Sequence, residues 1–312
     1  MARISCRYPH TSSVGTDEVT KGTLCMNTLL AVDGSDNAYE AVRALKHFRR
    51  ADTLTLLHVL DVPRPAYPMM VPEVAEELYR TVEKGMREEG QRLLDRVASL
   101  LPPGAGTAHK RLEVGSPAEL ILKEADQGKV DLILMGSRGI GPVKEQLFGS
   151  VSHRVLTLAS AATGIISAPL KALNRVLLPL QGPDDAEAAV KFMGTKPFRG
   201  DVELILFTVF PTTSTPWPLD PGMAISMEQQ GLDSAKEFLT VTASKLIPLG
   251  YKTRTLAVPG VPTSMIMLEA EKLRPDLIVM GTHGRKGLSR FVYGSVSHAL
   301  LHSARYPILV YR

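Results

Sequence analysis

Short apolar runs alternate along this chain with longer segments whose apolar residues recur every three or four positions. Residues 28–33 form the first run, and residues 37–50 follow with Ala38, Ala41 and Val42 on one helical face. This spacing predicts a helix, whereas a short apolar run bounded by polar residues predicts a buried strand. Strands that alternate with helices of this length form right-handed βαβ units, which build a parallel sheet covered by helices on both faces.

The same order of elements occurs twice along the chain. The matching elements are the opening strands at 28–33 and 176–181, the second strands at 54–60 and 202–209, and the long amphipathic helices at 73–100 and 227–246. We therefore expect an α/β fold of two tandem, open, five-stranded parallel-sheet domains of the Rossmann-like type, at 27–170 and 171–312. Residues 1–26 are rich in Ser, Thr and Gly, and we expect a disordered tail there.

A glycine pattern follows the fourth predicted strand in each half. Its members are Gly136, Gly139, Gly149 and Ser150 in the first copy, and Gly281, Gly284, Gly294 and Ser295 in the second. Each copy has the form Gly-x2-Gly-x9-Gly-Ser. The first two glycines allow the backbone to turn and to approach a ligand closely. The Gly-Ser pair opens a helix, whose free N–H groups and dipole favour phosphate oxygens.

The two copies differ at the residues expected beside a nucleoside. Asp33, at the end of the first strand, is suited to accept hydrogen bonds from a ribose or a base. Gln181 stands at the matching position of the second half, and Pro183 stands where the first half has Ser35. Glutamine lacks the anionic acceptor, and proline lacks a backbone donor. The sequence therefore predicts one strong and one weakened site.

Composition limits the classes of partner. The 312 residues carry a formal net charge of +4 with a pI near 9.0, and no dense Lys/Arg stripe interleaved with aromatics is present, so we expect no nucleic-acid partner. No apolar run approaches the length of a membrane span. Both cysteines, Cys6 and Cys25, precede the first predicted strand, which favours a reducing, cytoplasmic location.

The combined motifs resemble the universal stress protein family, as two tandem copies over 27–312. The similarity rests on 31–35, on 57–59, on 115–117, and on the two glycine elements with their preceding strands. The resemblance to the ATP-binding branch of that family implies ATP as ligand, with ADP or AMP as alternatives and Mg²⁺ as an accompanying ion. It also implies that the terminal strands, 164–168 and 308–311, pair to form an internal pseudo-dimer, and it leaves room for a homodimer. The short junction at 169–173 agrees with docked domains.

The resemblance implies a set of nucleotide-binding residues in each half. In the first half they are Val32, Asp33, Val59, Met135, Gly136, Arg138, Gly139, Gly149, Ser150, Val151 and Ser152. In the second half they are Leu180, Gln181, Val209, Met280, Gly281, His283, Gly284, Gly294, Ser295, Val296 and Ser297. We assign no catalytic residue and no metal ligand.

A P-loop ATPase would carry Gly-Lys-Ser/Thr after its glycines, and neither copy does. Three other functions remain open. Without an assignable general base, we favour a nucleotide-sensing regulatory protein that hydrolyses little or no ATP. The alternative is a slow ATPase or phosphotransferase at the same site, and the third is a protein of this fold that binds no nucleotide.

Overall fold

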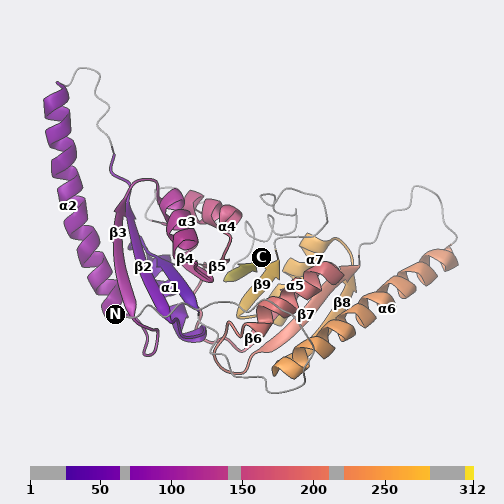
Figure 1. The fold of residues 1–312 in the computed structure, drawn as a ribbon. Coiled ribbons are helices and arrows are strands. Elements are labelled where there is room, and N and C mark those ends of the chain that lie inside the picture. Colours follow the sequence, from indigo (N-terminus) through magenta and orange to yellow (C-terminus); the bar gives the residue numbers. More distant parts are fainter. Residues whose placement is uncertain (1–25, 64–70, 140–148, 211–220, 282–305) are drawn as a thin grey trace, which may run out of the picture.

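One ten-stranded sheet runs through both halves of the chain and carries helices on both faces (Figure 1). The structure is a computed structural model and describes residues 26–63, 71–139, 149–210, 221–281 and 306–312. The α/β fold and the tandem arrangement expected from the alternating pattern are confirmed.

The elements of the two halves follow the same order. The first half contains β1 (Asn27–Ala31), α1 (Asp36–Ala44), the 3-10 turn η1 (Leu45–His47), β2 (Thr53–Leu60), α2 (Pro72–Ser99), β3 (Ala108–Val114), α3 (Pro117–Gln127), β4 (Leu132–Gly136), α4 (Ser150–Leu158) and β5 (Ala162–Ile166). The second half contains β6 (Arg175–Pro179), α5 (Pro183–Gly194), β7 (Glu203–Phe210), α6 (Pro221–Leu246), the 3-10 turn η2 (Ile247–Leu249), β8 (Lys252–Pro259), α7 (Pro262–Leu273), β9 (Leu277–Gly281) and β10 (Ile308–Tyr311).

The strand order places a topological switch in each half and joins the halves at their last strands. The order is β3-β2-β1-β4-β5-β10-β9-β6-β7-β8, and neighbours are parallel except for β5 and β10. These two strands are antiparallel, with Ile308 opposite Ile165 and Val310 opposite Thr163. The predicted pairing of the terminal strands is thus confirmed, and the two five-stranded sheets are halves of one sheet.

Successive residues of each strand pack into two separate hydrophobic layers, one on each face of the sheet. Leu30 and Leu134 face the layer under α1, α2, α5 and α6, whereas Leu29 and Ile133 face the layer under α3, α4 and α7. All four are fully buried, because a parallel sheet between two helix layers has no solvent face. This explains why the strands read as continuous apolar runs.

A second contact joins the halves beneath the sheet junction. Phe48 and Phe198 form an antiparallel bridge, and their ring centroids lie 5.9 Å apart. Arg49 N–H donates to Pro197 O at 2.8 Å, and Arg199 N–H donates to His47 O at 2.9 Å. The two bonds are reciprocal, as expected of equivalent segments related by a pseudo-two-fold axis. The halves therefore dock through this bridge as well as through the pairing of β5 with β10.

His47 lies at this junction and has a shifted pKa. Its Nε2 lies 2.8 Å from Leu170 O, and burial lowers the pKa of the imidazole below its usual 6.5, with Lys46 lowering it further and Asp276 opposing this. Because the unfolded imidazole then binds a proton more readily than the folded one, stability is lost as the pH falls below about 6.5. We expect the melting temperature to fall less steeply between about pH 6.5 and 5 in His47→Gln than in the wild type.

The matched control is His109→Gln, because His109 is exposed on the edge strand β3. Thermal unfolding of the three proteins across this pH range is the measurement. Equal pH slopes of the melting temperature in the wild type and in His47→Gln would show that His47 does not contribute to the loss of stability in acid.

Several boundaries differ from the sequence expectations. The first helix was expected to reach residue 50, but α1 ends at Ala44 and η1 follows, because Phe48 turns extended to bridge Phe198. Met26, expected in the tail, is buried, and its N–H lies 2.5 Å from the Asp52 carboxylate. Residues 1–25 lie outside the described residues. The fifth strand lies at 162–166 rather than 164–168.

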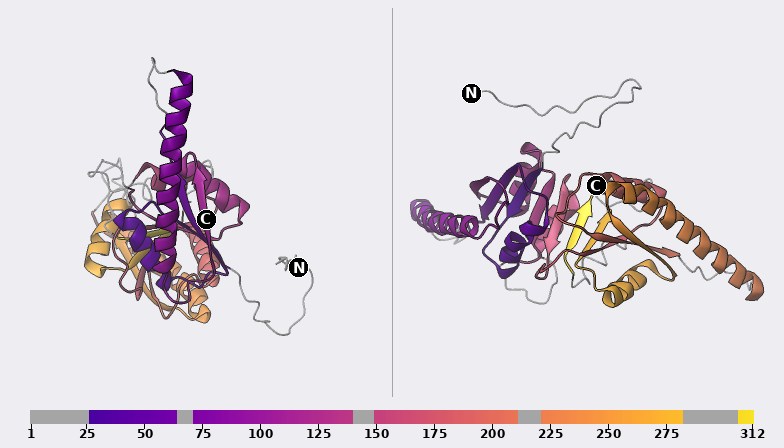
Figure 2. Two further views of the ribbon diagram at one scale, coloured as in Figure 1. Left: turned by 90° about the vertical axis from the view of Figure 1, so that its left-hand side faces the viewer. Right: turned by 90° about the horizontal axis from the view of Figure 1, so that it is seen from below.

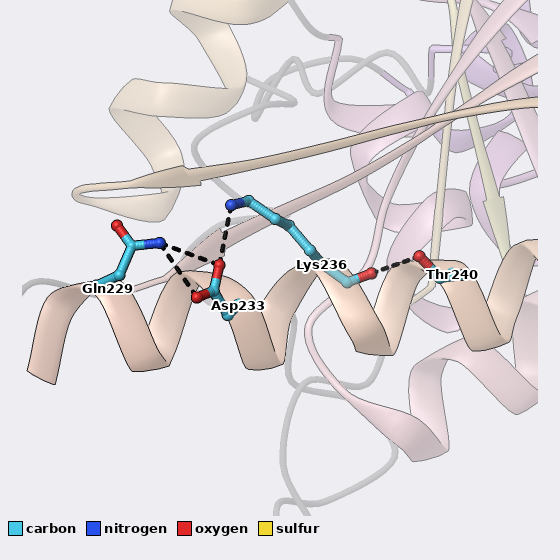
Figure 3. Close-up of polar contacts among 4 residues, drawn as sticks. All are labelled: Gln229, Asp233, Lys236 and Thr240. Carbon is cyan, nitrogen blue, oxygen red and sulfur yellow. Dashed lines mark hydrogen bonds and ion pairs between the residues drawn. The ribbon is translucent and has the colours of Figure 1, made fainter.

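The two longest helices, α2 and α6, lie at opposite ends of the sheet, and both extend past it (Figures 1 and 2). On α6, Gln229 and Lys236 both donate to the Asp233 carboxylate, and Thr240 Oγ1 donates to Lys236 O (Figure 3). None of the helices in the described ranges is long and apolar enough to span a bilayer.

Candidate functional site

The candidate site of the first half lies where β1 and β4 end side by side. In the sheet, β2 lies beside β1 on one side of this point, and β5 lies beside β4 on the other side. Open parallel sheets bind ligands at such a switch, beyond the carboxyl ends of the strands. Three segments meet here: residues 32–35 after β1, residues 137–139 after β4, and the start of α4 at Gly149 and Ser150.

Asp33 is held in a tight turn at the centre of these segments. Its Oδ1 accepts from the Ser35 N–H at 3.0 Å and from the Ser35 hydroxyl at 2.6 Å. Gly34 lies between them at φ +83°, a left-handed conformation that disfavours a side chain. A Cβ on Gly139 would lie only 2.4 Å from Asp33 Oδ2. The carboxylate therefore lies directly against the glycine loop.

Ser35 links that loop to the first helix. Its Oγ lies 2.9 Å from Arg138 O and accepts from the Ala38 N–H at 3.2 Å, which caps α1. Because the hydroxyl has one proton, it is shared between Asp33 and Arg138 O. Asn37 adds a contact between the same segments, with Nδ2 donating to Ser137 Oγ at 3.2 Å. The side-chain network fixes the loop relative to Asp33.

Gly136 permits the close approach of α1 to β4. A Cβ at this position would lie 2.7 Å from the backbone nitrogen of Ala38 and 2.9 Å from Asn37 Cβ. These are backbone and near-backbone atoms of the first helical turn, which cannot move aside without shifting the helix. The glycine is required here by packing, whether or not a ligand is bound.

The start of α4 is the place where an anion is expected to bind. Gly149 precedes this helix with no side-chain cap, and Ser150 is exposed in its first turn. Uncapped first-turn N–H groups and the helix dipole favour an anion. Gly149 has an ordinary φ of −76°, and a Cβ there would meet Ser137 O at 3.5 Å, so its backbone does not require glycine.

Ser152, one of the implied nucleotide-binding residues, has its hydroxyl bonded within the chain. Its side chain is buried, and its hydroxyl lies 2.8 Å from Ser137 O and 2.9 Å from Gly149 O. The Gly149 N–H also donates to Ser137 O at 2.8 Å. The Ser152 hydroxyl therefore connects Ser137 and Gly149 within the chain. The spacing in the sequence alone could not distinguish this bonding from a contact to a ligand.

The apolar candidates form the walls of the switch. Val32 and Met135 are buried on opposite faces of the sheet, while Val59 and Val151 are half-buried. The Val32 N–H donates to Leu57 O at 2.9 Å, and its carbonyl lies 2.7 Å from His58 Nδ1. Both backbone groups of Val32 thus have partners within the chain.

The second half has the same backbone frame with different side chains. Leu180 N–H donates to Phe207 O at 2.8 Å, and its carbonyl accepts from Thr208 Oγ1 at 2.7 Å, as Val32 does in the first half. Val209 is half-buried and Met280 is buried. Gln181 is exposed, and its N–H donates to Asp185 Oδ2 at 3.0 Å. The candidates His283, Gly284, Gly294, Ser295, Val296 and Ser297 lie outside the described residues.

Asp185 and Tyr311 form a contact that the sequence analysis missed. Asp185 occupies the position of Asn37, and its Oδ1 accepts from the Tyr311 hydroxyl at 3.2 Å and would lie 2.5 Å from a Cβ on Gly281. Tyr311 is fully buried and stacks on Phe192 at 5.2 Å, and burial followed by the Asp185 charge raises the pKa of its hydroxyl. Aligning the two halves residue by residue, with Asn37 over Asp185, was the available signal.

The described residues contain no candidate metal site. Across the described ranges, no group of three or more His, Cys, Asp or Glu side chains lies close enough together to hold a metal ion.

Two segments of the chain, residues 26–163 and 172–312, match the Universal stress protein family. The chain belongs to this family. The two matches cover most of both halves, so the family and the tandem form expected from the motifs are confirmed, and the family gives the chain a general stress-related role.

Relatives of known sequence and structure match the chain over most of its length or over about half of it. Over 305 residues the chain is 27% identical to universal stress protein Rv2005c of Mycobacterium tuberculosis, covering 91% of this chain and 96% of the relative. Universal stress protein YxiE of Bacillus subtilis is 31% identical over 143 residues, covering 44% of this chain and 96% of YxiE. A solved universal stress protein from Archaeoglobus fulgidus is 20% identical with a TM-score of 0.61, covering 93% of this chain and 98% of that structure. At 20% identity, the similarity to the Archaeoglobus fulgidus structure shows the fold alone.

Proposed function

We propose that the first half binds ATP at the β1/β4 switch, and that the protein is a nucleotide-sensing regulator with little or no hydrolysis. One observation carries this proposal. Asp33, the Arg138–Gly139 loop and the uncapped start of α4 converge at one point of the sheet. A carboxylate at one end suits a ribose or base, and a helix N-terminus at the other suits phosphates.

The position of Asp33 favours binding over turnover. Its Oδ1 already accepts two hydrogen bonds from Ser35. Both bonds hold the carboxylate in the turn at residues 33–35. It also lies at the strand end expected to hold the nucleoside, which is unsuited to activating water beside the γ-phosphate.

The second half is proposed to bind nucleotide more weakly. The exposed Gln181 replaces the carboxylate, and the acid of this half, Asp185, is bonded to the Gln181 N–H and the Tyr311 hydroxyl. Asp185 lies on α5 and contacts Gly281 and Tyr311, so it does not take the place that Asp33 has after the first strand. We place the activity in the cytoplasm, with ADP or AMP as alternative ligands and Mg²⁺ accompanying ATP.

Native purification followed by nucleotide analysis tests the proposal. We expect ATP to remain bound at close to one molecule per chain, and a phosphate-release assay to show little turnover. Rapid turnover that depends on this site would instead establish the slow ATPase or phosphotransferase. Protein without bound adenine and without a thermal shift on adding ATP, ADP or AMP would contradict nucleotide binding altogether.

A further inference from the structure

The first part of α2 projects past the sheet with an apolar stripe on it. We call residues 73–89 of this helix the α2 arm (Figures 1 and 2). Throughout the arm the side chains are exposed or half-buried, and Gly90 is the first buried residue. At Gly90 the helix meets β2 and β3, since a Cβ there would lie 2.7 Å from Leu112 Cδ1. The arm is about 25 Å long at 1.5 Å per residue.

The apolar stripe of the α2 arm lies on a different face of the helix from the residues with which α2 packs on the sheet. Val71, just before the helix, and Val74, Leu78 and Val82 are 36–58% exposed and recur every three or four residues. At 3.6 residues per turn they share one face, roughly a third of a turn away from the face of Gly90, Leu94 and Val97 that packs on the core. Large apolar side chains gathered on one face mark an interaction surface.

Two charged residues flank this stripe on one side and have no ion-pair partner on their own helix. Glu76, Glu83 and Glu88 each pair with the arginine four residues later, at positions 80, 87 and 92. No ion pair joins Glu77 or Lys84 to any residue in the described part of the chain. Being seven residues apart, Glu77 and Lys84 lie on one line along the helix, beside Leu78.

We propose that the α2 arm is a dimerisation surface that pairs antiparallel with the α2 arm of a second copy of this chain. In an antiparallel pair the same flank of each helix faces its counterpart. With Leu78 opposite Val82 of the second copy, Glu77 of each chain comes beside Lys84 of the other. Two apolar contacts and two opposite-charge contacts form at once, and the two-fold symmetry closes the assembly.

The other projecting helix does not fit this role. Met223, Ile225 and Met227 are exposed on α6, but its next turn on the face of Met227 carries Gln230 and Gly231, and Gly231 packs against Phe210. The charges nearby, Asp233 and Lys236, pair with each other (Figure 3). This end of α6 therefore lacks the long apolar stripe, and it carries no acid and base seven residues apart that match Glu77 and Lys84.

Sedimentation velocity of the full chain over a concentration series tests the proposal. A pair of short arms buries less than the roughly 1,200 Å² of a stable interface, so we expect a dimer that dissociates at concentrations on the order of micromolar. Leu78→Glu is expected to leave only monomer, while the matched variant Ile225→Glu on α6 still dimerises. A wild type that is monomeric throughout the series, or a dimer that Leu78→Glu leaves unchanged, would overturn the proposal.

Charge exchange tests the antiparallel orientation with variants that leave the core untouched. Glu77→Lys and Lys84→Glu each place like charges opposite one another twice and are expected to weaken the dimer about tenfold. Mixing the two variants, or combining both changes in one chain, restores the opposite-charge contacts and the dimer. In a parallel pair this flank of one helix faces the opposite flank of the other, so Glu77 and Lys84 would not meet and neither single change would weaken association. That result would contradict the proposed arrangement.

Discussion

Replacing Asp33 with alanine is expected to weaken ATP binding by roughly tenfold to a hundredfold, the loss typical of a charge-assisted hydrogen bond worth about 1.5–3 kcal/mol. The carboxylate lies between the Ser35 turn and Gly139, at the strand end proposed to hold the nucleoside. Its removal takes away the anionic acceptor and also releases Ser35 from the turn. Equilibrium dialysis with labelled ATP measures the dissociation constant.

Two further variants separate charge from loop geometry. Asp33→Asn keeps an oxygen for Ser35 but loses the charge, so an intermediate affinity is expected. Asp36→Ala removes a carboxylate that is exposed in the first turn of α1, and it should leave the affinity unchanged. If Asp33→Ala bound ATP as tightly as the wild type, Asp33 would have no part in the site.

Gly136→Ala is expected to lower the free energy of unfolding by about 2–3 kcal/mol, the upper range for an overpacked core position. The new methyl would lie 2.7 Å from Ala38 N and from Asn37 C, so α1 must shift away from β4. Denaturant unfolding followed by circular dichroism gives the change in midpoint. This effect requires no ligand and therefore tests the packing at the site by itself.

Gly281→Ala is the matched change in the second half. There the methyl would meet Asp185 Oδ1 at 2.5 Å, with the Tyr311 ring next at 3.3 Å. A carboxylate can rotate away, at the loss of its hydrogen bond to the Tyr311 hydroxyl, which at 3.2 Å is long and is worth about 1.5 kcal/mol. A Gly281→Ala cost equal to or larger than that of Gly136→Ala would contradict this difference between the halves.

The strands and their pairing could be predicted because both depend on periodic apolar patterns. Leu29 and Leu30 face different helix layers, so the whole run must be apolar, and the repeat of that run placed ten strands in two halves. The resemblance added the antiparallel contact between the terminal strands, now seen as Ile308 opposite Ile165.

Other features depend on contacts between residues far apart in the chain. The end of α1 at Ala44 follows from the bridge between Phe48 and Phe198, which no local pattern contains. The buried hydroxyl of Ser152 depends on where Ser137 O lies after β4. Sequence spacing gives the position of a serine on a helix, but it does not give the partner that takes its proton.

The same distinction applies to the second half. Comparing Asp33 with Gln181 identifies a lost acceptor, whereas the pairing of Asp185 with Tyr311 brings together residues 126 positions apart. That pairing supports the proposed difference between the two sites, because Asp185 is bonded to Tyr311 on the last strand of the chain.

Calorimetric titration of the intact chain with ATP and Mg²⁺ counts the nucleotide sites and ranks their affinities. We expect one tight binding event per chain, lost in Asp33→Ala, with any second event markedly weaker. Two equal events, or a titration that Asp33→Ala leaves unchanged, would contradict this expectation.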